Sequence, residues 1–158
     1  MRGQRTTKII AVIALAASVV PLAHGQSGPT DNDIHAAYCA SALTATIKRD
    51  SQRKPSANDL MREVWRGVIN EQTKRRDRFG AYLEARGYFN STNKTLADAL
   101  AVATKRGEQE ELQCDSDRTA CLGKCAATNV TVGCIQQCKN LSSCQSIDAC
   151  NSKDALPF

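Results

Sequence analysis

The chain has 158 residues and a formal net charge of +5; 42% of the residues are hydrophobic and only 4% are aromatic. This length is enough for one domain, but alanines supply many of the apolar residues, so the core is expected to be small. Three of the basic residues lie in an N-terminal segment that we expect to be removed, so the net charge overstates the basic character of the mature chain, and the expected export disfavours a nucleic-acid partner.

Residues 1–25 have the pattern of an export signal. Arg2, Arg5 and Lys8 precede an apolar run over residues 9–23, which is too short to span a bilayer comfortably. Small residues follow at the positions expected of a cleavage site, so the mature chain is predicted to begin at Gln26 with a net charge of +2. We therefore expect a secreted or periplasmic protein with no transmembrane segment after cleavage; a retained anchor is the alternative.

Residues 26–158 are predicted to form a single all-α domain, with a helical region over 26–113 and a cysteine-rich helical hairpin over 114–150. The first helix is expected at 31–49 with Asp31 or Asp33 as its N-cap, the second from about 56 to 87, and the third from Thr95 to Gly107. Gly87 is the expected C-cap of the second helix, although Arg75 and Arg76 interrupt its pattern.

The second helix carries an apolar stripe that is typical of a helix with one buried face. Its large apolar residues recur at three- and four-residue steps: Leu60, Met61, Val64, Trp65, Val68 and Ile69. In the first helix, Ile34, Tyr38, Leu43 and Ile47 lie along one side, and Cys39 shares a face with Leu43. Cys39 is therefore expected to point toward the core.

Seven of the eight cysteines lie between Cys114 and Cys150. Two C-x3-C pairs each place two sulfur atoms on one helical face, and the segment between them suits a reversal of direction. In an antiparallel hairpin this pairs Cys121 with Cys138 and Cys125 with Cys134. Because the residue numbers of facing partners have a nearly constant sum, Cys114 is expected to pair with Cys144. Cys39 and Cys150 remain as the fourth pair.

The C-x3-C pairs resemble the helical hairpins of plant α-hairpinins and of the small chaperones of the mitochondrial intermembrane space. The resemblance covers Cys121 to Cys138, and the segment between the two pairs is shorter here than is usual in those families. It implies a helical hairpin and no particular activity. An exported chain with an even number of cysteines favours structural disulfides over a zinc site or a redox dithiol, so no cofactor is expected.

Few residues suggest catalysis. His35 is the only histidine left after removal of the leader, and it has no recognisable nucleophile motif beside it. Asp59 with Glu63, and Glu108 with Glu111, share helix faces, but such pairs are common on exposed helices. A small secreted enzyme that uses His35 and a carboxylate is therefore an alternative to the main hypothesis.

The densest basic run consists of Lys74, Arg75, Arg76 and Arg78, and it is a candidate site for an anionic surface ligand. A solvated helix face is the simpler interpretation of such a run. Our main hypothesis is a binding or structural protein with an unidentified protein partner, for example an inhibitor of a secreted hydrolase that presents residues 126–133. A cationic surface-binding protein is the other alternative.

Overall fold

A computed structural model describes residues 28–53, 59–90, 94–127 and 132–152. Within these ranges the chain is all-α, as predicted, and contains no strand. The α-helices are α1 (Asp31–Gln52), α2 (Asp59–Ala85), α3 (Lys94–Ala127), α4 (Val132–Lys139) and α5 (Gln145–Cys150). Two short 3-10 turns, η1 (Tyr88–Asn90) and η2 (Ser142–Cys144), complete the described elements. The predicted leader lies outside the described residues.

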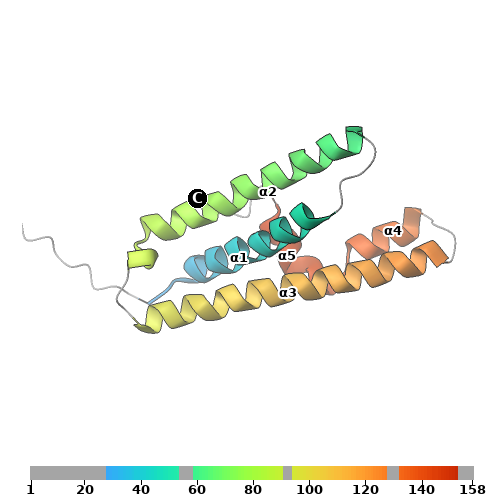
Figure 1. Ribbon diagram of the computed structural model, residues 1–158. Helices are drawn as coiled ribbons and strands as arrows, with labels where there is room; N and C mark the ends of the chain where they lie inside the picture. Colours follow the sequence, from blue (N-terminus) through green and yellow to red (C-terminus); the bar gives the residue numbers. More distant parts are fainter. Residues whose placement is uncertain (1–27, 54–58, 91–93, 128–131, 153–158) are drawn as a thin grey trace, which may run out of the picture.

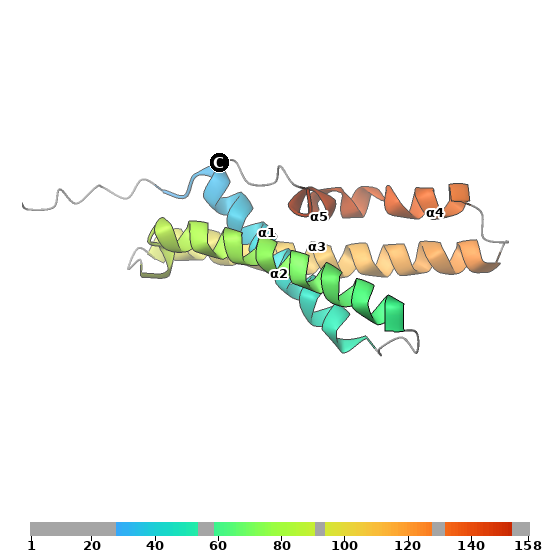
Figure 2. The same cartoon turned by 90° about the horizontal axis from the view of Figure 1, so that it is seen from above.

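Helix α1 lies at the centre of the molecule and packs against α2, α3 and α5. The long helix α3 crosses below α1, and α4 and α5 run back along its C-terminal half (Figure 1; Figure 2). The core is built around small residues of α1, with Leu43, Phe79, Leu83 and Ile147 as its large buried members. Helix α1 thus takes part in the two most extensive contacts of the bundle, those with α3 and α2, whereas α4 and η2 pack on α3.

Helix α1 begins at a capping box that differs from the predicted one. Thr30, rather than Asp31 or Asp33, is the N-cap, and its hydroxyl accepts a hydrogen bond from the Asp33 backbone N–H at 3.3 Å. The Asp33 carboxylate accepts hydrogen bonds from the Thr30 N–H and hydroxyl, both at 2.7 Å. It also accepts from the hydroxyls of Tyr82 and Tyr88 and pairs with Arg86. One buried carboxylate thus ties the start of α1 to the end of α2.

Helix α2 runs without a break past Arg75 and Arg76 and ends at Ala85. Gly87 then adopts a φ of 77°, and its N–H donates to the Glu84 carbonyl at 2.8 Å. This left-handed conformation favours glycine because it has no Cβ, so the prediction of a C-cap at Gly87 is confirmed.

The prediction that a helix ends at Gly107 is wrong, because α3 continues through it to Ala127. Gly107 is buried where α3 crosses α1, and a Cβ at this position would overlap the Tyr38 carbonyl oxygen and lie 3.3 Å from the Ala42 backbone nitrogen. The sequence signal for a helix end is therefore a signal for the close approach of two helices.

Replacing Gly107 with alanine is expected to destabilise the protein by about 1–3 kcal/mol, because the added methyl group meets backbone rather than a movable side chain. Gly123 is the matched control on the same helix, with open space around its Cβ position. Gly123→Ala should be neutral or stabilise by up to about 1 kcal/mol through the higher helix propensity of alanine. Urea unfolding of the two variants tests this, and equal stabilities would contradict the close crossing.

The N-terminal half of α2 departs most from expectation. Leu60, Met61, Val64, Trp65 and Val68, predicted to line a buried face, leave 37–69% of their surface exposed. Only Phe79 and Leu83, in the C-terminal half of α2, are buried. Ile34 of α1 is also exposed, whereas Tyr38, Cys39 and Leu43 are buried. The apolar stripe therefore faces an open part of the bundle.

The C-terminal segment forms a disulfide-linked helical hairpin on α3. The structure joins Cys121 with Cys138 and Cys125 with Cys134 between α3 and α4, and Cys114 with Cys144 between α3 and η2. Cys39 of α1 joins Cys150 at the end of α5. The first three are the pairs that the nearly constant sum of residue numbers predicts, and the fourth is the pair that remained by elimination. Across the described ranges no helix is long and apolar enough to cross a membrane.

Candidate functional site

The basic run on α2 is only partly available to an anion. Lys74 pairs with Glu71 at 2.8 Å, which lowers the pKa of the Glu71 carboxyl, and Arg76 pairs with Asp77 at 2.6 Å. At 3.6 residues per turn, Lys74, Arg75 and Arg78 share one side of the helix and Arg76 lies on the other. The four cations therefore do not converge, and anion binding at these residues stays a prediction.

His35 lies beside a disulfide rather than beside a nucleophile. Its Nε2 is 3.5 Å from the Cys39 Sγ, and its ring meets Phe79 edge-on. It lines a cleft of about 370 Å³, formed by Asp31, Ile34, His35, Tyr38, Ala103, Arg106, Ser146 and Ala149. Asp31 and Ser146 share this cleft, but in the described part of the chain no hydrogen bond is recorded from His35 to either residue. A His35-based catalytic site stays an untested alternative.

A second cleft, called the polar cleft below, lies where α1, α2, α3 and α5 meet and has a volume of about 240 Å³. It holds three arginines and four carboxylates beside three large apolar side chains. Its lining consists of Thr46, Arg49, Asp50, Arg53, Trp65, Val68, Gln72, Glu111, Cys114, Asp115, Arg118, Ile147, Asp148 and Asn151.

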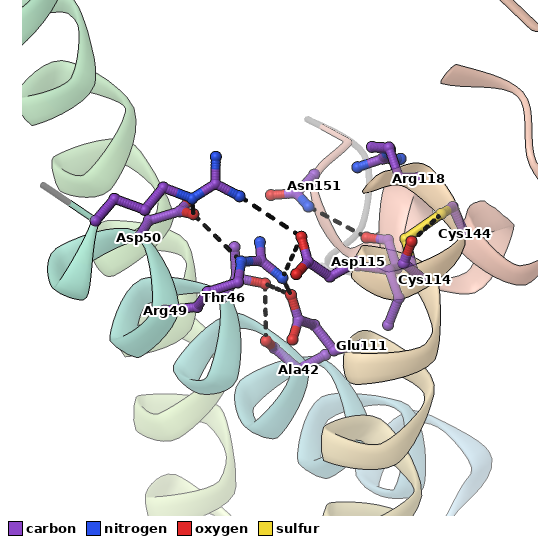
Figure 3. Close-up of polar contacts among 12 residues, drawn as sticks. Ala42, Thr46, Arg49, Asp50, Glu111, Cys114, Asp115, Arg118, Cys144 and Asn151 are labelled. Carbon is purple, nitrogen blue, oxygen red and sulfur yellow. Dashed lines mark hydrogen bonds and ion pairs between the residues drawn. A yellow bond between two sulfur atoms is a disulfide. The ribbon is translucent and has the colours of Figure 1, made fainter. Parts of the chain in front are cut away.

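Glu111 lies at the centre of the polar side of this cleft (Figure 3). It is only 2% exposed. One carboxylate oxygen, Oε1, accepts a hydrogen bond from the Thr46 hydroxyl at 3.1 Å and pairs with the Arg49 guanidinium. Arg49 also contacts Asp115 at 3.2 Å, one turn further along α3. Helices α1 and α3 run in the same direction, and Glu111 follows Gly107 by one turn. Glu111 therefore faces α1 one turn beyond the point where the two helices cross.

The other Glu111 oxygen, Oε2, is buried without a hydrogen-bond partner within the described ranges. Two further buried atoms of the lining share this property there: Gln72 Oε1 on α2 and Arg118 Nε on α3. Buried polar atoms are nearly always paired, because removing them from water costs about 1–3 kcal/mol each. All three atoms belong to residues that line one cleft.

Asp33 and Glu111, which are both buried, differ in how their charge is compensated. Burial alone would raise the pKa of Asp33, but hydrogen bonds from Tyr88, Thr30 and Arg86 hold it well below its ordinary value. Burial raises the pKa of Glu111, and its contacts with Arg49 and Thr46 only partly oppose this. Asp33 therefore stabilises the fold in its charged form, whereas ionised Glu111 is incompletely compensated, as is common at binding and catalytic sites.

The arginines of the polar cleft are held by carboxylates of the chain. Arg53 pairs with Asp50 at 3.3 Å and with Asp115 at 3.5 Å, and Arg118 pairs with Asp148 on α5 at 3.2 Å. Arg53 also lies over the Trp65 ring, 5.5 Å from its centroid. With every group ionised, four carboxylates and three guanidiniums leave the lining with one net negative charge.

Two disulfides hold the α5 wall of the polar cleft. Cys114, itself a lining residue, is bonded to Cys144 at the start of this wall, and Cys39 is bonded to Cys150 at its end. Ile147, Asp148 and Asn151 are thereby fixed opposite α3. By restricting the unfolded chain, these disulfides stabilise the folded arrangement of this wall.

The sequence pattern did not predict this site, because Glu111 lies in an acidic run that was expected to be an exposed helix face. That interpretation is wrong for Glu111, which is buried, and right for Glu108, which is exposed. The sequence feature that indicates the burial of Glu111 is Gly107, four residues earlier. Residues four apart share a face of a helix, so a glycine buried at a helix crossing places the residue four positions later toward the partner helix.

The hairpin loop at 126–133 falls partly outside the described residues, so its presentation to a partner stays a prediction. The sulfur atoms of Cys121, Cys125 and Cys138 lie within 4.8 Å of one another, but all three are oxidised in disulfides and offer no thiolate to a metal.

Comparisons of the chain with protein-family models, with curated proteins and with solved structures returned no match.

Proposed function

We propose that this protein is exported and acts as a binding protein, with the polar cleft as the site for a small ligand. Its four disulfides and helical fold fit a secreted protein. The observation that carries the proposal is the buried Glu111 carboxylate, which has one oxygen paired and, within the described residues, one without a partner. A group that binds there gains the hydrogen bond that the fold leaves unmade.

The composition of the cleft supports a small ligand rather than a large one. Its volume of about 240 Å³ lies below the range of about 300–1,000 Å³ that is usual for drug-sized ligands. Trp65, Val68 and Ile147 provide apolar contact area beside the polar groups. Such a mixture of apolar walls and a few fixed polar atoms is typical of small-molecule sites.

Trp65 provides a direct test, because it is the only tryptophan in the chain and it lines the cleft. We expect its fluorescence to change saturably when the purified mature protein is titrated with fractions of small molecules from the medium of the cells that produce it. Val68→Phe, which fills the cleft, should abolish the change.

The matched control is Val102→Phe, which adds the same bulk at an exposed position of α3 that does not line the cleft. This variant should respond as the unmodified protein does. If no fraction changes the fluorescence, or if Val68→Phe responds as strongly as Val102→Phe, the cleft is not the ligand site.

A further inference from the structure

We propose that the ligand of the polar cleft is an organic amine, whose ammonium group binds Glu111 and Gln72 and whose apolar chain lies against α2. This inference rests on the proposed function and names the ligand class. It combines three independent features of the cleft: the kind of buried atom without a partner, the net charge of the lining, and the apolar wall that continues beyond it.

The head group follows from the two buried acceptors. Glu111 Oε2 and Gln72 Oε1 both accept hydrogen bonds, and neither has a donor among the residues that the structure describes. They come from different helices, α3 and α2, but line the same cleft. An ammonium group carries three donors and no acceptor, so it can satisfy both oxygens. A carboxylate or phosphate would bring only acceptors to them.

The net charge of the lining also favours a cationic ligand. Arg49, Arg53 and Arg118 are each paired with carboxylates of the chain. With all groups ionised the lining has one negative charge in excess, which a single monovalent cation balances. An anion would double the imbalance inside a partly buried site, where charges are poorly screened.

The apolar wall explains why the cation should be organic rather than a metal ion. Trp65 and Val68 line the cleft, and Leu60, Met61 and Val64 extend the same stripe of α2 away from it. All five side chains are exposed, and burial of their surface by a hydrocarbon chain would be favourable. A hydrated metal ion would gain nothing from this wall.

The third buried atom without a partner in the described part of the chain, Arg118 Nε, distinguishes two kinds of amine ligand. It is a donor, and it belongs to a residue about two turns beyond Glu111 on α3. The backbone carbonyl oxygen of a lysine residue, whose ammonium binds Glu111, is an acceptor of the kind that this donor lacks. A plain alkyl amine would leave this donor unused.

The experiment is calorimetric titration of the mature, disulfide-bonded protein with defined compounds of similar length. Hexylammonium is expected to bind, whereas hexanoate and hexanol should bind at least about tenfold more weakly, because a charge-assisted hydrogen bond contributes about 1.5–3 kcal/mol. Nα-acetyl-lysine amide distinguishes a lysine residue of a peptide from a free amine. Tighter binding than hexylammonium indicates a lysine side chain, and weaker binding indicates a free amine. Both results support an ammonium ligand.

Variants then test the assigned atoms. Glu111→Gln retains the shape and removes the charge, and Gln72→Leu removes the acceptor on α2; each should weaken hexylammonium binding about tenfold. Glu108→Gln, on the exposed side of α3, is the control and should leave binding unchanged. Gln72→Leu does not touch the Arg49 pair, so it keeps the test informative if Glu111→Gln folds poorly.

Equal binding of hexylammonium, hexanol and hexanoate would overturn the inference, as would amine binding that both variants leave unchanged. If natural small-molecule fractions bind in the Trp65 assay but no amine does, the ammonium assignment fails and the proposed function stands. If neither fractions nor amines bind, both fail.

Discussion

Replacing Cys39 and Cys150 together with alanine is expected to lower the free energy of unfolding by about 4–5 kcal/mol. The two cysteines are 111 residues apart, so their disulfide closes most of the described chain into one loop and restricts the unfolded state strongly. Both residues are fully buried, and the bond fastens the end of α5 to the central helix. Since small domains are typically stable by about 5–15 kcal/mol, this loss would be a large share of the total.

The matched control is the double replacement of Cys125 and Cys134, which are only nine residues apart. The same chain-entropy relation gives about 2–3 kcal/mol for so short a loop. Urea unfolding followed by circular dichroism measures both values. The Cys39 and Cys150 variant should also lose the response of Trp65 to ligand, because the α5 wall of the polar cleft is released. A larger loss for the hairpin variant than for the α1–α5 variant would contradict the expected order.

Replacing Asp33 with asparagine is expected to destabilise the protein by about 2–4 kcal/mol at neutral pH. The change keeps the shape of the side chain but removes the charge that Arg86, Tyr82 and Tyr88 all contact. It also weakens the capping box at the start of α1. Asp31→Asn is the control, because Asp31 lies in the same helical turn but is exposed.

The effect of Asp33 has a defined pH dependence. Its pKa is lower in the folded protein than in the unfolded chain, so ionised Asp33 stabilises the fold at all pH values above about 4. As the pH falls below about 4, the unfolded chain takes up the proton first and this contribution is progressively lost. The difference in stability between the unmodified protein and Asp33→Asn should therefore narrow toward pH 2. A difference that stays constant from pH 7 to pH 2 would show that the charge of Asp33 does not matter.

The disulfide pairing illustrates how much of the fold was predictable. The i, i+4 spacing of cysteines defines a helical face, and an antiparallel hairpin leaves only one way to match two such faces. The structure contains these pairs; the pair Cys114–Cys144 follows from the same geometry, and Cys39–Cys150 is the pair that then remains. Gly87 as a C-cap is a similar case, because the positive φ at a helix end is a local requirement.

The polar cleft could not be predicted in this way, because periodicity shows which residues share a face but not whether another helix covers that face. The stripe of Leu60, Val64 and Trp65 has the pattern of a buried surface, yet it faces an open part of the bundle. Glu111 lies in a run of acidic residues that is typical of an exposed helix, yet it is 2% exposed.

The sequence by itself determined the helical class of the fold and the disulfides of the hairpin, because these depend on spacing within one or two neighbouring segments. The tertiary structure alone decided which carboxylate is buried. Gly107 allows α3 to approach the backbone of α1 near Tyr38 and Ala42, and this contact sets the register of the two helices. One turn further on, the same register places Glu111 against Thr46 and Arg49. Contacts between residues more than sixty positions apart thus place Glu111 in the cleft, and the spacing of residues along one helix does not show which partner helix covers them.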